Sequence, residues 1–228
     1  SKGVCVSVEV KSADSASVAA AYAKKFDAEL DLGDAKLTDV DIPDVWVPES
    51  MTWLARLGGD LDGHLASDEV SSVAESLVGV GVPESQKSDK SVTHWSKASV
   101  KSADPRNDAA TLALAMGTVT DSKSVPAVES DGMPVVSAAQ VDAHNTKNPE
   151  DKWVFSELQP KLRAFDYPFI TQSKLDSELQ RATEAFKAAL VHDKFTTALT
   201  KYGMTKAGPY PQPVETEDVN KALSQSWL

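Results

Sequence analysis

Cysteine, basic residues and long hydrophobic runs are all scarce in this chain of 228 residues. The single cysteine, Cys5, cannot form an internal disulfide, and one cysteine with four scattered histidines does not make a metal-ligand cluster. No stretch approaches the roughly 20 consecutive apolar residues of a membrane helix, and no signal-peptide pattern is visible. Cys5 alternates with valines in a strand-like run, so we expect it to be buried and unmodified. We also expect no metal and no cofactor.

The shortage of basic residues excludes further classes of function. Lys and Arg number 23 against 34 Asp and Glu, which gives a net charge of −11. Such a chain is repelled by phosphate backbones, and it has no basic amphipathic helix for an anionic membrane. The serines lack a GxSxG elbow and no Gly-rich phosphate loop is present. Many acidic residues could form a catalytic pair, but the sequence alone cannot place two of them at a useful separation. We therefore expect neither nucleic-acid binding nor an enzyme.

What the sequence does contain is a repeated polar turn. The string VKSAD occurs at residues 10–14 and again at residues 100–104. Each copy lies between a strand-like run and a helix-like segment; the four flanking segments are 4–10, 15–26, 97–100 and 106–119. Two interpretations are open: a coincidence of composition, or two strands that end in the same kind of turn facing a ligand.

Strand-like and helix-like segments also alternate along the rest of the chain. In order, they are a strand at 42–47, a helix at 51–59, a strand at 77–82, a strand or helix start at 133–139, a strand at 161–173 and a helix at 175–203. The apolar stripe of the helix at 106–119 is Leu112, Ala115, Met116 and Val119. This alternation favours an α/β protein with mostly parallel sheets, in which ligands bind where strand ends meet helix starts.

Five segments, in their order along the chain, resemble a known family. They are IPDVWVPES with the Trp-Leu helix that follows it, SLVGVGVP, SADPRNDAAT, FDYPFI and AFKAALVHDKFTTALTKYGM. The resemblance is to bacterial extracellular solute-binding domains of the type II periplasmic-binding-protein fold. Within these it is to the molybdate-like branch, often found ahead of a von Willebrand factor A domain in actinobacterial envelope proteins. It covers most of the chain, from Val4 to Met204.

The resemblance implies an α/β, two-lobed type II periplasmic-binding-protein fold with mostly parallel sheets and two inter-lobe crossings, SLVGVGVP and FDYPFI. Lobe 1 would comprise residues 1–79 and 169–228, and lobe 2 residues 80–168. The implied location is extracytoplasmic, either secreted or anchored in the cell envelope. Relatives begin with a further strand–helix unit, so we expect that unit, a signal segment and any von Willebrand domain or membrane anchor to lie outside the numbered residues.

The resemblance also implies which residues line the cleft between the lobes, and none of them is implied to be catalytic or to bind metal. They are Ser12, Asp14 and Ser15 after the first strand-like run; Trp46, Glu49 and Ser50; the turn residues Asp104, Arg106, Asn107, Asp108 and Thr111; and Tyr167 at the return crossing.

The residue types at these positions leave structural alternatives open. Asn107 or Asp108 can cap a helix, and the N–H groups behind them could bind an anion or a carbonyl group beside Arg106, or simply form an ordinary helix start. Trp46 is either a stacking platform for a ligand or the cover of a lobe interface. Tyr167, which precedes a proline, is a rigid crossing element whose hydroxyl can reach the cleft.

The function expected from the resemblance is that of a non-catalytic module that holds a small polar solute between two closing lobes. Asp14 and Asp104 favour a neutral or zwitterionic ligand over a strongly anionic one, and we expect both VKSAD turns to face the cleft. The alternative is a protein-interaction or cell-envelope assembly module that keeps the fold without a small ligand. The expected partner is therefore a solute or an envelope protein, with membrane contact only through an anchor or domain outside this chain.

Overall fold

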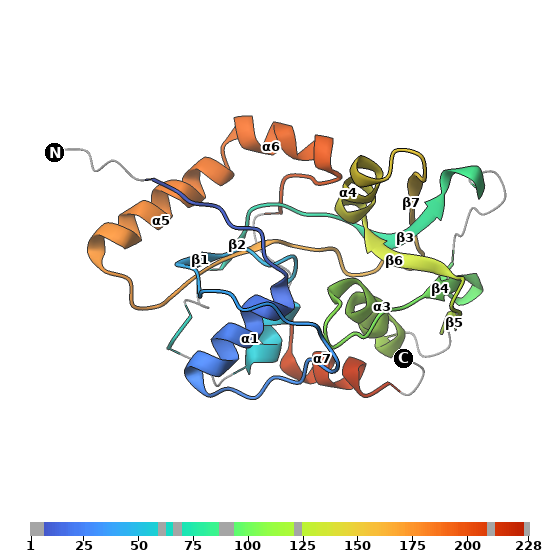
Figure 1. The fold of residues 1–228 in the computed structure, drawn as a ribbon, viewed down its shortest axis with the longest axis horizontal. Helices are drawn as coiled ribbons and strands as arrows, with labels where there is room; N and C mark the ends of the chain where they lie inside the picture. Colours follow the sequence, from blue (N-terminus) through green and yellow to red (C-terminus); the bar gives the residue numbers. More distant parts are fainter. Residues whose placement is uncertain are drawn as a thin grey trace.

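The computed structural model describes residues 7–58, 63–65, 70–86, 94–120, 125–208 and 213–225, and Figure 1 shows its elements. The helices are α1 Ser15–Phe26, α2 Thr52–Leu57, α3 Ala109–Thr120, α4 Ala138–Lys147, α5 Ser177–Leu190, α6 Asp193–Leu199 and α7 Thr216–Leu223, with 3-10 turns η2 Glu84–Gln86, η3 Trp95–Lys97 and η4 Thr200–Tyr202. The strands are β1 Val45–Trp46, β2 Ser71–Ser72, β3 Val78–Pro83, β4 Ser99–Lys101, β5 Ala127–Val128, β6 Met133–Ser137, β7 Trp153–Glu157 and β8 Pro168–Thr171.

The strands form two separate sheets. β1, β8 and β2 make a small antiparallel sheet, while β5, β4, β6, β3 and β7, in that spatial order, make a larger mixed sheet. The α/β fold class predicted from the sequence is confirmed, but the pairing is mixed instead of mostly parallel. β4 pairs in parallel with both β5 and β6, as expected after the crossover helix α3. The chain enters this sheet by β3 and leaves by the neighbouring β7, so these two strands run in opposite directions.

The chain passes between the two sheets twice, from β2 to β3 and from β7 to β8. The two passages lie side by side, because the backbones of Ser76 and Phe165 exchange hydrogen bonds of 2.9 and 2.8 Å. A third segment joins them, since Glu75 and Thr205 exchange bonds of 2.9 and 2.8 Å in the same way. We call these four residues the hinge. No sequence pattern indicated the third segment.

Several local elements lie where the sequence patterns place them. α1 begins at Ser15 because the Asp14 carboxylate accepts a hydrogen bond of 3.2 Å from the amide of Ser17. α2 ends at Gly58, which has a φ of 59° that favours glycine. β3 and β4 cover two of the strand-like runs, and α3 covers most of the helix predicted at 106–119.

The long helix predicted at 175–203 is divided. α5 and α6 are separate because the backbone of His192 leaves the helical conformation and its Nδ1 atom accepts a hydrogen bond of 3.2 Å from the amide of Lys194. Apolar periodicity continues across this break, which explains why the pattern did not reveal it. No helix in the described ranges combines the length and the apolar character that crossing a membrane requires.

The strand predicted at residues 4–10 is wrong over its described part. Residues 7–10 are in no strand, and the side chains of Val8 and Val10 are 48% and 80% exposed. Alternation of apolar and polar residues shows which face of a strand would be buried, but it does not supply a neighbouring strand to bury it. The prediction that Cys5 is buried lies outside the described residues.

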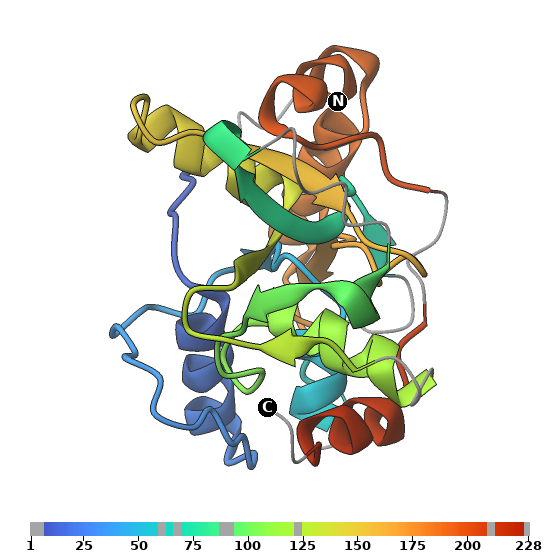
Figure 2. The same cartoon turned by 90° about the vertical axis from the view of Figure 1, so that its right-hand side faces the viewer.

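Helix α7 joins the two halves of the molecule. The stripe predicted on α3 packs against it: Leu112 and Ala115 form a buried cluster with Val219 and Ala222, and Met116 and Val119 pack around its edge. Figure 2 shows α7, in red, below the green helix α3. α7 belongs by sequence to the predicted lobe 1, yet it contacts α3, which follows a strand of the five-stranded sheet.

We expect Leu112→Ala to weaken this junction. Leu112 is 1% exposed, so its truncation should cost about 2–5 kcal/mol of unfolding free energy and lower Tm by roughly 5–15 °C. The matched control is Leu37→Ala, because Leu37 is 46% exposed and its loss should change the free energy by less than about 0.5 kcal/mol. Calorimetry on the two variants checks the difference, and equal Tm values would contradict the packing described here.

Candidate functional site

The first polar turn leads into α1 and reaches the segment after β1. Ser12 and Asp14 are exposed, and Asp14 caps the helix. Ser15 is buried, and its hydroxyl donates a hydrogen bond to the carboxylate of Glu49. This bond joins residues that are 34 positions apart in the sequence.

Glu49 connects several elements. Its carboxylate accepts hydrogen bonds from the Ser15 hydroxyl and from Nε1 of Trp53 at 2.9 Å, and its carbonyl accepts one of 3.3 Å from the amide of Tyr167. Burial raises the pKa of the Glu49 carboxyl, and the nearby charge of Asp14 raises it further, while the two donated hydrogen bonds oppose both effects. Glu49 therefore lies at the meeting point of α1, α2 and the return passage, in surroundings that disfavour its charged form.

Ser50 and Trp46 occupy structural positions. The buried Ser50 hydroxyl accepts a hydrogen bond of 3.2 Å from the amide of Thr52 at the start of α2. Trp46 is 5% exposed and lies in the hydrophobic core beneath α1, where its ring centroid is 5.5 Å from that of Tyr22. Burial leaves little of the indole to meet a ligand, so in this structure Trp46 is a core residue and not a stacking platform.

The second polar turn is built around an ion pair. Arg106 donates to the Asp104 carboxylate from Nε at 3.0 and 3.1 Å and from Nη2 at 2.8 Å. These hydrogen bonds hold the pKa of the Asp104 carboxyl below its usual range. Asn107 points out of the turn, and its Nδ2 donates to the carbonyl of Leu32 at 3.2 Å. The turn therefore contacts the loop between α1 and β1.

Asp108 and Thr111 close the start of α3. The Asp108 carboxylate accepts a hydrogen bond of 2.7 Å from the amide of Thr111, whose hydroxyl in turn accepts one of 3.1 Å from the amide of Ala103. Burial raises the pKa of the Asp108 carboxyl, the bonds from Thr111 oppose this, and the charge of Asp14 adds to it. This is the capped helix start that the sequence left open as the structural alternative.

Tyr167 has an unusual backbone conformation in the return passage. Its φ of 35° lies in a region that residues other than glycine rarely adopt. Hydrogen bonds hold it there on both sides, from its own amide to Glu49 and from the amide of Val73 to its carbonyl at 3.1 Å. Burial raises the pKa of its hydroxyl, and the charge of Glu49 adds to this effect. Tyr167 is therefore a crossing element whose ring lies within the electrostatic influence of Glu49.

These contacts bring the predicted residues together in two groups. We call the first the acidic site: Asp14, Ser15, Glu49, Asp108 and Tyr167. Its members affect one another, because the charge of Asp14 raises the pKa of both Glu49 and Asp108. The second group is Asp104, Arg106 and Asn107, which face the loop after α1. The start of α3 is thus under the electrostatic influence of the start of α1. Thr111 is bonded to Asp108 of the acidic site, whereas Ser12, Trp46 and Ser50 belong to neither group.

Sequence reasoning missed the residues that meet the second turn. Asp31 and Gly33 lie in a polar stretch that gave no periodic signal, and Arg56 is in the short helix α2. Nη1 of Arg56 donates to the carbonyl of Arg106 at 2.7 Å. The one available signal was the spacing of Asp31 and Gly33, because an Asp two residues before a glycine is typical of a tight turn.

Comparison with known proteins supports the fold. No protein-family model matches the chain, and no curated protein matches it significantly. Solved structures of similar shape include a periplasmic thiamin binding protein, with 10% identity, a TM-score of 0.55, and coverage of 93% of this chain and 85% of that one.

Two further structures give the same result. The periplasmic binding protein AfuA from Actinobacillus pleuropneumoniae, with fructose-6-phosphate bound, is 11% identical with a TM-score of 0.54, covering 94% of this chain and 86% of that one. The sulfate-binding protein SubI from Mycobacterium tuberculosis is 12% identical with a TM-score of 0.54, covering 91% and 93%. The chain thus has the two-lobed fold of the type II periplasmic binding proteins, as the sequence resemblance predicted.

We expect Glu49→Gln to stabilise the protein at high pH. The folded-state pKa of Glu49 is raised, so its contribution to stability is present below the unfolded-state pKa and is lost as the pH rises through the folded-state value. Glutamine keeps an oxygen for Trp53 and carries no charge, so Tm should rise by about 2–4 °C at pH 8, the effect of roughly 1 kcal/mol.

The gain should shrink as the pH falls towards 4, because the raised pKa of Glu49 lets the carboxyl group take up a proton as the solution becomes more acidic. Glu29→Gln is the control, because Glu29 is exposed on the loop after α1. Thermal unfolding of both variants between pH 4 and pH 8 is the measurement. A Glu49→Gln protein that is less stable at pH 8 than at pH 4, relative to wild type, would contradict the burial described here.

Proposed function

We propose that the protein is a non-catalytic, extracytoplasmic solute-binding module that holds a small polar ligand between its two lobes. The observation that carries this proposal is the convergence on Glu49 of the start of α1 and of Tyr167, with Asp108 at the start of α3 under the electrostatic influence of Asp14 at the start of α1. In two-lobed α/β proteins this is the place where ligands bind, since strand ends and helix starts from both lobes face one another there. We keep the predicted lobes, residues 1–79 with 169–228 and residues 80–168, as part of the proposal.

The charges of the acidic site favour a particular kind of ligand. Asp14, Glu49 and Asp108 are carboxylates, and the guanidinium of Arg106 is already bonded to Asp104. An oxyanion placed among these carboxylates would be repelled, whereas an ammonium group or hydroxyl donors would be attracted. We therefore propose a neutral or zwitterionic ligand whose donor groups meet Glu49 and Asp108.

Binding would act through the hinge. A ligand that contacts both lobes stabilises the arrangement in which they are close, and it shifts the population toward that arrangement. Tyr167 links the two events, because its backbone is bonded to Glu49 and it follows the hinge residue Phe165 by two positions.

A second candidate function is a protein-interaction or envelope-assembly module without a small ligand. The observation that favours it is direct contact between the proposed lobes. Arg56 of lobe 1 donates to the carbonyl of Arg106 in lobe 2, and Asn107 of lobe 2 donates to the carbonyl of Leu32 in lobe 1. Cavities of about 270 and 310 Å³ lie elsewhere, one lined by Glu84, Ser85 and residues 149–152, the other by residues of α3, α7 and 160–163. The molybdate-like branch and the von Willebrand partner stay predictions from the sequence resemblance.

A ligand screen distinguishes the two candidates. Thermal-shift assays with amino acids, amines, sugars and oxyanions, followed by calorimetric titration, should find a neutral or zwitterionic ligand that raises Tm. At 100 times its Kd such a ligand stabilises the folded protein by about 2.7 kcal/mol.

Glu49→Gln should weaken this binding, while Glu29→Gln should leave it unchanged. Tight binding of sulfate or molybdate with no response to amines would overturn the proposed ligand class. Failure of every solute, together with specific capture of a purified envelope protein, would favour the interaction module.

A further inference from the structure

The loop after α1 and the second polar turn contact each other through a small set of residues. They are Asp31, Leu32 and Gly33 from the loop, Asp104, Arg106 and Asn107 from the turn, and Arg56 from α2. We infer that these residues form a latch that holds the two lobes together when no ligand is bound. The latch does not depend on the identity of the ligand, so the experiment that tests it is independent of the test of the proposed function.

Arg106 provides the ionic part of the latch. Its Nη1 lies 3.4 Å from Oδ2 of Asp31, while Nη2 and Nε are bonded to Asp104. Asp104 thus orients the guanidinium within its own turn and Asp31 meets it from the opposite loop. The Arg106 and Asp31 side chains are 41% and 72% exposed, so this contact is open to screening by salt.

Hydrogen bonds to backbone carbonyls provide the second part. Arg56 donates to the carbonyl of Arg106 at 2.7 Å and also to the carbonyl of Asp31, so one guanidinium holds both sides of the contact. Asn107 adds a bond from the turn to the carbonyl of Leu32. Because these acceptors are uncharged, this part should resist salt better than the ion pair does.

Gly33 allows the two segments to approach so closely. Its φ is 56°, and the Asp31 side chain fixes the loop by accepting a hydrogen bond of 2.9 Å from its amide. A Cβ atom at this position would lie 2.7 Å from Cζ and Nη2 of Arg106 and would also collide with Asp104. The backbone conformation favours glycine, and a larger residue would push the ends of the Asp104 and Arg106 side chains out of their ion pair.

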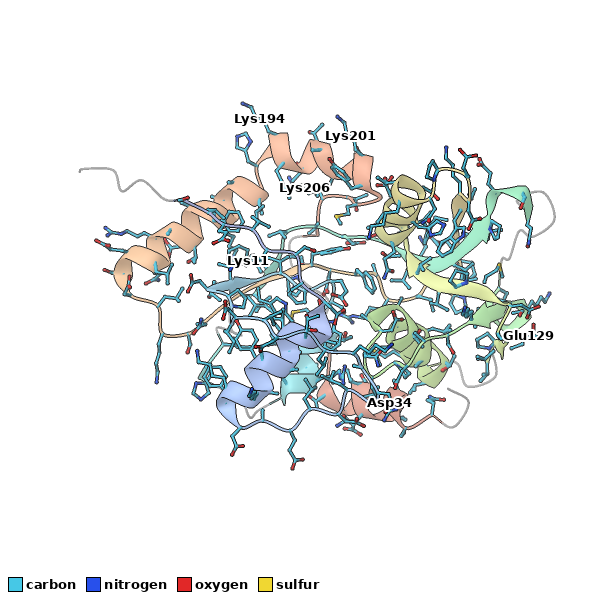
Figure 3. The ribbon with its side chains drawn as sticks, in the orientation of Figure 1. Lys11, Asp34, Glu129, Lys194, Lys201 and Lys206 are labelled. Atoms are coloured by element: carbon cyan, nitrogen blue, oxygen red, sulfur yellow. The ribbon has the colours of Figure 1, made fainter. Side chains whose placement is uncertain are left out.

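The latch is placed where it can act on the hinge. Figure 3 labels Asp34, which follows Gly33, at the lower side of the molecule, and Lys206, which follows the hinge residue Thr205, at the upper side. When two lobes rotate about a hinge, the contacts farthest from the hinge separate the most, so bonds there oppose opening most effectively. Weak bonds there are sufficient to shift the balance between open and closed forms.

Single-molecule energy transfer on ligand-free protein tests the latch. Dyes would be placed at Lys24→Cys on α1 and Asp131→Cys between β5 and β6, in a Cys5→Ser background, since both positions are exposed. The protein with the unaltered latch should give a main closed population and a small open one. Arg106→Ala and Asn107→Ala should each raise the ratio of open to closed molecules about fivefold, the factor that corresponds to roughly 1 kcal/mol.

Arg181→Ala is the matched control, because it removes an exposed arginine from α5, away from the contact. Far-UV circular dichroism verifies that each variant is folded, and 1 M NaCl on the unaltered protein provides a test that needs no substitution, with partial opening expected. Equal transfer efficiency in the unaltered protein, Arg106→Ala and Asn107→Ala would overturn the latch. Whether the ligand screen finds a solute has no bearing on that result, because the energy-transfer measurement is made without ligand.

Discussion

The Glu49 carboxylate accepts hydrogen bonds from Ser15 at the start of α1 and from Trp53 in α2, and its backbone carbonyl receives the amide of Tyr167. One residue thus joins two helices to the passage by which the chain returns from the larger sheet. The neighbouring Met51 amide adds a bond of 2.9 Å to Asp166, which strengthens the same junction. A residue without an acceptor oxygen here would leave two partly buried donors unpaired, which costs more than an average hydrogen bond contributes, whereas glutamine would retain one acceptor oxygen.

Concentrating carboxylates at this junction costs stability. Burial disfavours the charged forms of Glu49 and Asp108, and Asp14 adds like charge to both. The adjacent core around Tyr22 and Trp46 packs through apolar contacts and does not need this charge. Perturbed carboxyl groups of this kind occur both at functional sites and in structural networks. The acidic site thus carries an electrostatic cost that the ligand of the proposed function, with its donor groups, would offset.

Sequence patterns were sufficient where the residues of one element decide its structure, as at the Asp14 cap of α1 and the Gly58 end of α2. The resemblance added the two-lobed fold, which no local pattern contains. Reasoning failed at residues 4–10, because alternation says nothing about a neighbouring strand. For Trp46 a strand pattern does not distinguish a core position from a cleft position, and only the structure shows that its side chain is buried. The contacts of residues 31–33 could not be predicted from local patterns, because they join turns about 75 positions apart in the sequence.

The contact of α7 with α2 and α3 combines small and larger apolar side chains. Three alanines, Ala55, Ala115 and Ala222, lie among larger residues, which are Leu112, Met116, Val119, Val214, Val219 and Leu223. Side chains of such different sizes form ridges that fit into the grooves of a neighbouring helix, so sliding α7 along α3 would require them to repack. A rotation about the hinge would therefore either carry α7 along with α3 or separate α7 from α2. A helix of eight residues is about 12 Å long, so a shift of one turn would remove nearly half of its length from the contact.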